Sequence, residues 1–294
     1  MTLVVARVTR HQVYMLADTR VHDPRRPRNV TGGMLKTVLL SPSVVVAFTG
    51  DIELAEQAVL QFRATFGGTT PFRAAIEHFR KSTVDCENEY ILGFAGPKRL
   101  FHLHSGIEEE KQVAWIGDKN AFERFQEGPR SSTARYNRMT VIGPDIPDDE
   151  QLLEQISKFQ SVLEDPKVEG VGDFFSVLSG SGGRFWQPNI GTLYFDPSAK
   201  LLGPNGAPLI QATGENRVFS FSVWAPKNKT INATAFVFRG ARKGFVFHAV
   251  QAGFATQCDV FDRFTGDNLA AAIEARLGIS FGVFELTHER PDSM

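Results

Sequence analysis

Short apolar runs separated by polar or turn-forming residues fill the N-terminal part of the chain. The runs at residues 3–8 and 13–17 are rich in valine and leucine, with a polar segment between them. The runs at residues 34–40 and 43–48 follow the same plan around a serine–proline turn. Apolar runs of this length with turn residues between them predict β-hairpins. The nearly continuous apolar character of the second pair is typical of strands that are buried on both faces.

The spacing of apolar residues changes after Asp51, a residue type that favours the N-cap of a helix. From Ile52 the apolar positions recur as in an amphipathic helix at residues 52–62. The same kind of pattern predicts further helices, at residues 71–81, 120–127, 148–163 and 268–276. Runs rich in β-branched and aromatic residues predict further strands, at residues 90–95, 100–104, 113–116, 191–195, 218–224, 233–238, 244–250 and 279–286.

The predicted elements come in the order strands, two helices, strands, two helices, strands. An α+β fold accounts for this order, with an antiparallel two-sheet core and helices outside it. We treat residues 1–294 as a single domain, because 294 residues suit one enlarged core. The Gly- and Pro-rich segment at residues 201–208 marks a soft boundary. Residues 200–294 are therefore expected to form a partly divergent, β-rich C-terminal part.

The composition of the chain argues against several classes of function. The formal net charge of −1 offers no basis for binding nucleic acid or an anionic membrane surface. No stretch approaches the ~20 apolar residues of a membrane helix, and the N-terminal segment lacks the pattern of a signal peptide. The two cysteines, Cys86 and Cys258, have no partner spacing. We therefore expect a cytoplasmic protein with reduced thiols.

The residue after the initiator methionine is Thr2. Removal of Met1 is favoured when a small residue follows, and the mature chain would then begin with a threonine. That residue would carry a free α-amine beside its own hydroxyl. A hydroxyl is a poor nucleophile until a base takes its proton, and an α-amine with a pKa of ~7.7–8.0 is a suitable base near neutral pH. Thr2 is therefore a candidate nucleophile.

Three further residues supply what such a nucleophile needs. A nearby ammonium would lower the pKa of the α-amine, and Lys36 lies on the third predicted strand. Asp18, at the end of the second, would hold Lys36 in place. Gly50, at a strand-to-helix junction, offers a backbone N–H for an oxyanion.

Four segments of the chain carry these residues: Thr2-Leu3-Val4-Val5, Leu16-Ala17-Asp18-Thr19-Arg20, Met34-Leu35-Lys36 and Ala47-Phe48-Thr49-Gly50-Asp51. In order and spacing they resemble the proteasome β-subunit family of N-terminal nucleophile (Ntn) hydrolases. The step from Thr2 to Asp18 matches that of the family. Counted from Thr2, Lys36 and Gly50 both lie further along the chain than their counterparts in the family, by the same number of residues. One insertion in the loop before Gly33 would produce this shared offset.

A further segment, residues 114–122, resembles the strand–glycine–helix junction before the family's third helix. Its acidic residue, Asp118, is similar to the bacterial Anbu branch, whereas typical proteasome subunits have serine there. The Gly–Ser segment with Ser179 and Ser181 resembles the family's glycine–serine loops, but the aspartate expected before the serine is missing. A plain turn explains this segment equally well. The resemblance covers residues 2–165 well and the remainder poorly.

The resemblance implies a four-layer αββα sandwich with two antiparallel sheets flanked by helices. It implies Thr2 as the nucleophile, Asp18 and Lys36 as its electrostatic support, and the Gly50 N–H in an oxyanion hole. It also implies a substrate cleft that pairs with an extended peptide through Val21, and an apolar pocket lined by Met34, Val38 and Phe48. The implied protein is a threonine protease that needs no metal or cofactor. It assembles as a homo-oligomeric ring or spiral and acts on peptides or proteins, with any unfoldase partner unidentified.

Other interpretations of the same residues remain. Met-Thr is a common start of cytosolic proteins, Asp18 also fits a turn, and Lys36 also fits a solvated strand. The chain would then be a catalytically silent scaffold of the same fold. A third hypothesis is an Ntn amidase that acts on a small molecule. His102 and His104 alternate on a predicted strand, but without a third ligand they are more typical of an exposed strand than of a metal site.

Overall fold

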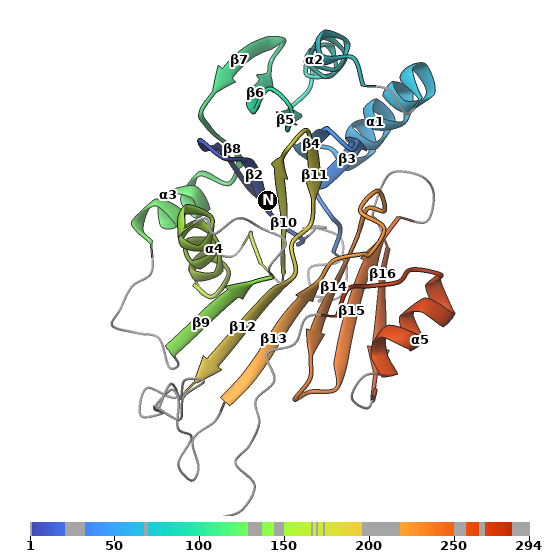
Figure 1. The fold of residues 1–294 in the computed structure, drawn as a ribbon. Coiled ribbons are helices and arrows are strands. Elements are labelled where there is room, and N and C mark those ends of the chain that lie inside the picture. Colours follow the sequence, from blue (N-terminus) through green and yellow to red (C-terminus); the bar gives the residue numbers. More distant parts are fainter. Residues whose placement is uncertain are drawn as a thin grey trace, which may run out of the picture.

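The fold is described from a computed structural model of the chain (Figure 1). It describes residues 2–20, 33–67, 70–128, 137–143, 150–165, 167–168, 170–172, 174–195, 218–249, 257–264 and 268–283. These residues form an α+β structure with three antiparallel sheets and five helices. In this part of the chain, no helix has the length and apolar character needed to cross a membrane.

The first sheet, sheet I, contains the N-terminal hairpin at its centre. Its strands lie in the order β11-β10-β2-β1-β8 and all pair antiparallel. They are β1 (Leu3–Val8), β2 (Val13–Asp18), β8 (Val113–Gly117), β10 (Phe175–Ser181) and β11 (Arg184–Trp186). The hairpin therefore acquires both of its neighbours from segments that are distant in the sequence.

Sheet II is a meander whose strands lie in sequence order from β3 to β7. They are β3 (Thr37–Ser41), β4 (Val44–Thr49), β5 (Glu89–Phe94), β6 (Arg99–His104) and β7 (Ile107–Lys111). Alternate residues of sheets I and II pack together in one apolar cluster, which includes Val4, Ala6, Met15, Ala17, Leu39, Val45, Ala47, Ile91 and Leu100. The period of two along each strand places these residues on the facing sides of the two sheets.

Helices cover the other faces of both sheets. α1 (Ile52–Phe66) and α2 (Phe72–Lys81) pack on sheet II through a second apolar cluster, which includes Val46, Phe48, Val59, Phe62 and Phe79. α3 (Lys119–Glu127) and α4 (Glu150–Leu163) pack on sheet I through a third, which includes Leu3, Val5, Phe125 and Phe159. Figure 1 shows the two helix pairs apart from each other, beside different sheets.

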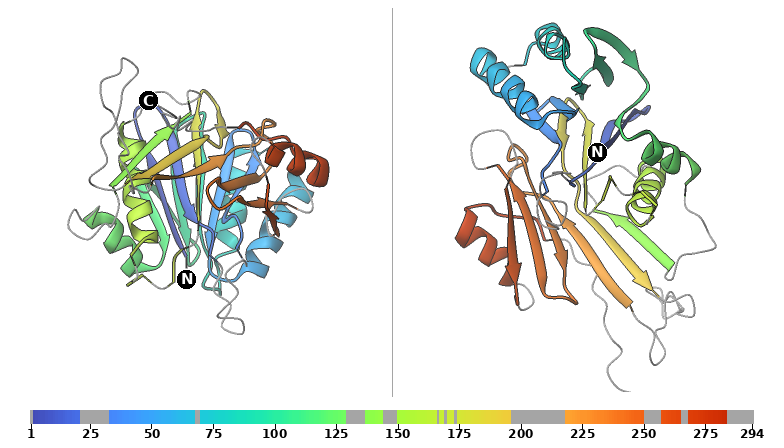
Figure 2. Two further views of the ribbon diagram at one scale, coloured as in Figure 1. Left: turned by 90° about the horizontal axis from the view of Figure 1, so that it is seen from below. Right: turned by 180° about the vertical axis from the view of Figure 1, so that it is seen from behind.

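Sheet III is built mostly from the C-terminal part, in the order β16-β15-β14-β13-β12-β9. Its strands are β9 (Asn137–Ile142), β12 (Ile190–Phe195), β13 (Val218–Trp224), β14 (Ala233–Phe238), β15 (Lys243–His248) and β16 (Gln257–Asp262). One face joins the cluster around Phe159 through Phe221, Phe236 and Phe247. α5 (Asn268–Leu277) packs on the other face, beside β15 and β16 (Figure 2).

The predicted α+β class and its antiparallel pairing are confirmed. The described residues form three sheets, whereas the resemblance implied two. The strand expected at residues 279–286 is absent from its described part, where Phe281 makes only an isolated bridge with Pro226. The Gly- and Pro-rich boundary at residues 201–208 lies outside the described residues, as does Val21.

Candidate active site around Thr2

Thr2 stands directly before β1, and its backbone is fixed by the start of α3. The Thr2 carbonyl oxygen accepts a hydrogen bond of 2.6 Å from the backbone nitrogen of Asp118. The next residue, Leu3, pairs with Gly117 at the end of β8. Thr2 as a whole is only 9% exposed. Thr2 is therefore held at the junction between sheet I and α3.

Gly117 makes this close approach feasible. Its φ of +103° lies in the region that L-residues with a side chain rarely adopt. A Cβ at this position would lie 2.0 Å from the Thr2 carbonyl oxygen. The sequence pattern included Gly117 in the strand–glycine–helix segment but gave it no role, since the contact with Thr2 joins residues far apart in the chain.

Replacing Gly117 by alanine is expected to displace Thr2 and to lower the free energy of unfolding. The unfavourable φ alone costs about 1–3 kcal/mol, and the contact with the Thr2 oxygen adds to it. Gly182→Ala is a matched control, because Gly182 also has a positive φ of 55° but has open space around its missing Cβ. Urea denaturation of both variants measures the difference. Equal destabilisation of the two would contradict a specific contact between Gly117 and Thr2.

Asp18 is the last residue of β2 and is completely buried. Its Oδ1 accepts from the backbone nitrogen of Leu3 at 2.9 Å and from Lys36 Nζ at 2.8 Å. Its Oδ2 accepts from the backbone nitrogen of Arg20 at 3.2 Å. The backbone of Gly172, in the segment before β10, also donates to this carboxyl group. The Asp18 carboxyl group is thus surrounded by hydrogen-bond donors, which favour its ionised form and so its pairing with an ammonium group.

Lys36 lies immediately before β3 and is 3% exposed. Its ammonium and the Leu3 nitrogen contact the same Asp18 oxygen, so Lys36 Nζ lies close to the residue that follows Thr2. Burial raises the pKa of the Asp18 carboxyl above its ordinary value, although Lys36 and the two backbone donors act in the opposite direction. The pair therefore places a buried cation beside the start of β1.

Gly50 directly follows β4, the neighbour of β3, and leads into α1. The backbone nitrogen of Phe48 donates to the Lys36 carbonyl oxygen at 3.2 Å, which joins the end of β4 to Lys36. Gly50 has a φ of +100°, and its missing Cβ would lie 2.5 Å from Asn88 Oδ1. Asn88 holds the junction in place, because its side chain accepts from the Asp51 nitrogen at 2.7 Å and donates to the Asp51 oxygen at 2.9 Å. Asp51 is the N-cap of α1, as its sequence position predicted.

The structure thus brings Thr2, Asp18 and Lys36 to one end of sheets I and II, with Gly50 just beyond the end of β4, the strand that contacts Lys36. The residues expected to line a substrate pocket are arranged differently. Met34, Val38 and Phe48 are all buried in the apolar cluster beneath α1 and α2. They contact the helices and offer almost no surface to a ligand in this conformation.

The three additional candidates have structural partners. The carboxylate of Asp118 caps α3 by accepting from the Ala121 nitrogen at 2.8 Å, while its backbone nitrogen binds Thr2. Ser179 is buried in β10, where its hydroxyl donates to the side-chain oxygen of Gln12. Ser179 pairs with Tyr14 and Ser181 lies beyond it, whereas Phe175 pairs with Asp18. Both serines therefore lie toward the opposite end of β2 from Asp18.

Sequence patterns missed several residues that shape the site. Asn88 and Gly172 reach Asp51 and Asp18 from distant segments. Ser176 is buried in β10, with its hydroxyl 3.5 Å from that of Thr37, the residue after Lys36. None of these residues belongs to a local motif, so only the long-range strand pairing reveals them.

Comparisons with known proteins add no assignment. No protein-family model matches the chain, and no curated protein matches it significantly.

Proposed function

We propose that the protein is a threonine-dependent hydrolase of amide or peptide bonds, with Thr2 as the nucleophile after removal of Met1. The observation that carries this proposal is the buried pair of Asp18 and Lys36 beside the start of β1. Lys36 Nζ and the Leu3 nitrogen contact one carboxylate oxygen at 2.8 and 2.9 Å. This contact holds the cation close to the backbone of Leu3, the residue that follows the proposed nucleophile.

The cost of burying these charges supports a functional role. A buried ion pair is often no more stable than apolar residues of the same volume, because both charges lose their hydration. Asp18 and Lys36 are 0% and 3% exposed and are surrounded by apolar strands. An ammonium fixed near an α-amine lowers the pKa of that amine by charge repulsion. The pair would therefore increase the fraction of free amine at neutral pH.

The proposed reaction begins with acylation. The Thr2 hydroxyl oxygen attacks the carbonyl carbon of the substrate amide, and its proton passes to the free α-amine of the same residue. The oxyanion that forms accepts a hydrogen bond from the backbone N–H of Gly50, whose position is fixed by Asn88. The carbon–nitrogen bond then breaks, and the leaving amine takes the proton from the α-ammonium. The product is an ester between the acyl group and Thr2.

Deacylation repeats these steps with water. The α-amine takes a proton from a water molecule, which attacks the ester carbonyl, and the Thr2 oxygen leaves with that proton. Lys36 and Asp18 stay paired and exchange no proton with the substrate in these steps. The residues named here account for every proton, and the reaction requires no metal ion or cofactor.

The resemblance to proteasome β-subunits extends this proposal to the whole molecule. We propose that sheets I and II, with α1 and α2 outside one and α3 and α4 outside the other, form the four-layer αββα core of an Ntn hydrolase. The apolar clusters between and outside the two sheets support it. Sheet III would be an addition to that core. We further propose a cytoplasmic homo-oligomer, in the form of a ring or spiral, that acts on peptides.

One observation favours a silent scaffold as the second candidate. Met34, Val38 and Phe48, which the resemblance assigns to the lining of a substrate pocket, are buried in the cluster with α1 and α2. If this packing persists with a substrate present, the pair of Asp18 and Lys36 would serve the fold alone. The same packing is compatible with an Ntn amidase, because a small amide substrate would occupy little of that pocket.

Substrate competition separates these candidates. Fluorogenic peptide amides with small apolar side chains before the cleaved bond are the first substrates to assay, with the Thr2→Ala variant as the blank. Cleavage that small-molecule amides do not inhibit supports the peptidase. Cleavage that small amides inhibit and longer peptides do not would assign the amidase. Equal rates for the wild type and the Thr2→Ala variant would contradict both enzymatic functions. The silent scaffold would then be the remaining candidate.

A further inference from the structure

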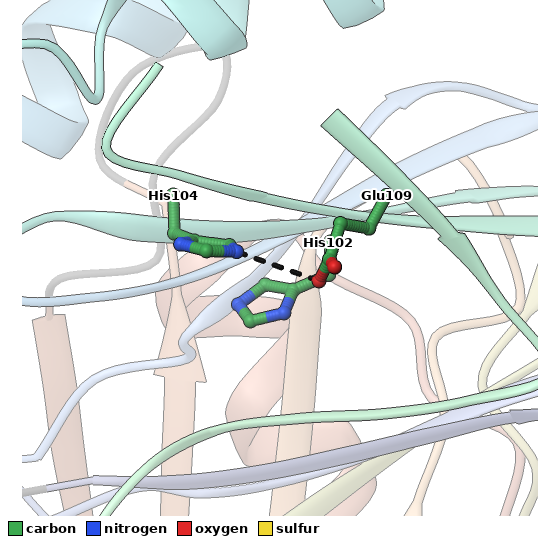
Figure 3. Close-up of side chains that lie close together, drawn as sticks. All are labelled: His102, His104 and Glu109. Atoms are coloured by element: carbon green, nitrogen blue, oxygen red, sulfur yellow. Dashed lines mark hydrogen bonds and ion pairs between the residues drawn. The ribbon is translucent and has the colours of Figure 1, made fainter. Parts of the chain in front are cut away.

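A cluster of metal-binding residue types lies on the hairpin β6–β7, outside the site around Thr2. His102 and His104 alternate along β6 and so lie on one face of sheet II. Glu109 of β7 pairs directly with His102, which brings its carboxylate to the same face. Figure 3 shows the three side chains directed toward one another. Among the residues that the structure describes, one ligand atom from each lies within 4.8 Å of the others.

The spacing of these atoms is close to that of a metal site. Zinc binds nitrogen and carboxylate oxygen at about 2.0–2.2 Å, so neighbouring ligand atoms in a tetrahedral site lie about 3.4 Å apart. His104 Nε2 and Glu109 Oε2 are already 3.4 Å apart. The two imidazole rings are 4.6 Å apart between centroids. Small side-chain rotations would bring the third ligand atom to bonding distance.

The hairpin that carries these residues is firmly held. Its turn consists of Ser105 and Gly106, both with positive φ. The Gly106 nitrogen donates to the Thr83 hydroxyl at 2.8 Å, and its oxygen accepts from Arg80 at 3.0 Å. The turn is therefore anchored to the end of α2, and the spacing of the ligands across β6 and β7 is set by the fold.

A fourth residue supports the orientation of His102. Glu89, on the adjacent strand β5, has its Oε2 3.2 Å from His102 Nε2. When Nε2 donates to this carboxylate, Nδ1 carries the lone pair. Metal-bound histidines commonly donate their second nitrogen to a carboxylate in this way. One feature opposes metal binding: the Lys111 ammonium lies 3.1 Å from Glu109 Oε2 and competes for that oxygen.

We propose that His102, His104 and Glu109 bind one divalent transition-metal ion of the zinc class, with water in the remaining coordination position. Two imidazoles and one carboxylate suit zinc and its neighbours, whereas magnesium and calcium take oxygen ligands. This proposal is independent of the function proposed for Thr2. The position of the cluster is nevertheless informative, because Thr49, Glu89 and His104 pair in one row across β4, β5 and β6. The metal would therefore bind at the end of sheet II that also carries Gly50.

Titration calorimetry with zinc chloride tests the proposal on the full-length protein, after chelator treatment and dialysis. We expect one zinc ion per chain, and a melting temperature that rises with zinc concentration because only the folded hairpin assembles the site. Loss of an outer-sphere partner alone costs about 10–100-fold in metal affinity, so loss of ligands should cost more. The double variant His102→Ala/His104→Ala is therefore expected to weaken binding more than ~100-fold, and Glu109→Gln to weaken it more than Glu89→Gln does. His11→Ala is the matched control, since His11 is exposed in the β1–β2 turn, which contacts Lys98 just before β6, at the opposite end of that strand from His104.

Two variants change the surroundings without removing a ligand. Glu89→Gln should weaken zinc binding by about 10-fold, as expected for loss of an outer-sphere carboxylate. Lys111→Gln should strengthen it, because the competing ammonium is removed. Equal zinc binding by the wild type and the double histidine variant would overturn the proposal. So would a loss of binding in His11→Ala as large as that in the double variant.

Discussion

Replacing Thr2 by alanine is expected to abolish amide hydrolysis while leaving the fold intact. The variant loses the attacking oxygen, and loss of a nucleophile lowers kcat by roughly 10³-fold or more. Alanine is also small, so removal of Met1 should proceed as in the wild type. The stability change should be modest, because Thr2 is held through its backbone contact with Asp118. The assay is the hydrolysis rate of a fluorogenic peptide, together with the urea midpoint.

Two controls accompany this prediction. Thr2→Ser keeps the hydroxyl beside the α-amine, so a substantial part of the activity should remain. Thr65→Ala removes a threonine hydroxyl from the exposed face of α1, where it donates to the Gln61 oxygen, and should change nothing. Full activity in Thr2→Ala would show that another group performs the attack.

Replacing Lys36 by methionine is expected to lower both stability and activity. The change leaves the buried Asp18 carboxylate without a cation, and breaking a buried pair in this way costs about 3–5 kcal/mol. It also removes the ammonium that lowers the pKa of the α-amine, so any remaining activity should shift toward higher pH. Urea denaturation and pH–rate profiles measure the two effects.

The double variant Asp18→Asn/Lys36→Met separates stability from catalysis. Asparagine keeps an oxygen that can accept from the Leu3 nitrogen, and no buried charge remains unpaired. The double variant should therefore recover much of the stability that Lys36→Met loses, because replacing both partners of a buried pair is often nearly neutral. Its activity should stay low, since the cation is still missing. Recovery of activity along with stability would contradict a catalytic role for Lys36.

The instability of Lys36→Met should also depend on pH. Burial raises the pKa of Asp18 in the folded state, and this effect is unopposed by a cation in the variant. A carboxyl whose folded pKa lies above its unfolded value of ~3.9 favours folding below that value and loses this contribution as the pH rises through the folded pKa. The stability gap between variant and wild type should therefore be larger at pH 7.5 than at pH 4.5. Lys119→Met, which breaks the exposed pair with Glu123, should show no comparable gap.

Local patterns predicted most of the elements that carry the site. The hairpin of β1 and β2, the hairpin of β3 and β4 and the start of α1 at Ile52 all follow from apolar spacing and turn residues. β3 begins at Thr37, so the predicted strand at residues 34–40 started too early. The Gly–Ser segment at residues 179–183 was expected to form a loop or turn, and Gly182 and Gly183 do form the turn between β10 and β11. Ser179 and Ser181 belong to β10 instead, because pairing with its neighbouring strands outweighs the weak strand propensity of serine and glycine.

Two of the strands that the patterns missed, β9 and β16, share a cause that does not apply to β10, which lies between β2 and β11. β9 and β16 contain several polar or charged residues, and they form strands because they lie at the two edges of sheet III. A strand at the edge tolerates such residues, since one side has no neighbouring strand to match. The contacts of Gly117 with Thr2 and of Gly172 with Asp18 were missed for a related reason. They depend on which distant segments become neighbours, and no local spacing encodes that.

The proposed function requires that Thr2 be freed of Met1 and act as the nucleophile. Intact-mass spectrometry after incubation with a peptide vinyl sulfone measures both at once, with Thr2→Ala treated in parallel. We expect a wild-type chain that has lost one methionine and gained one probe molecule, and a variant that has lost the methionine and gained no probe. A wild-type chain that keeps Met1, or a variant that takes up the probe equally well, would contradict the proposed function.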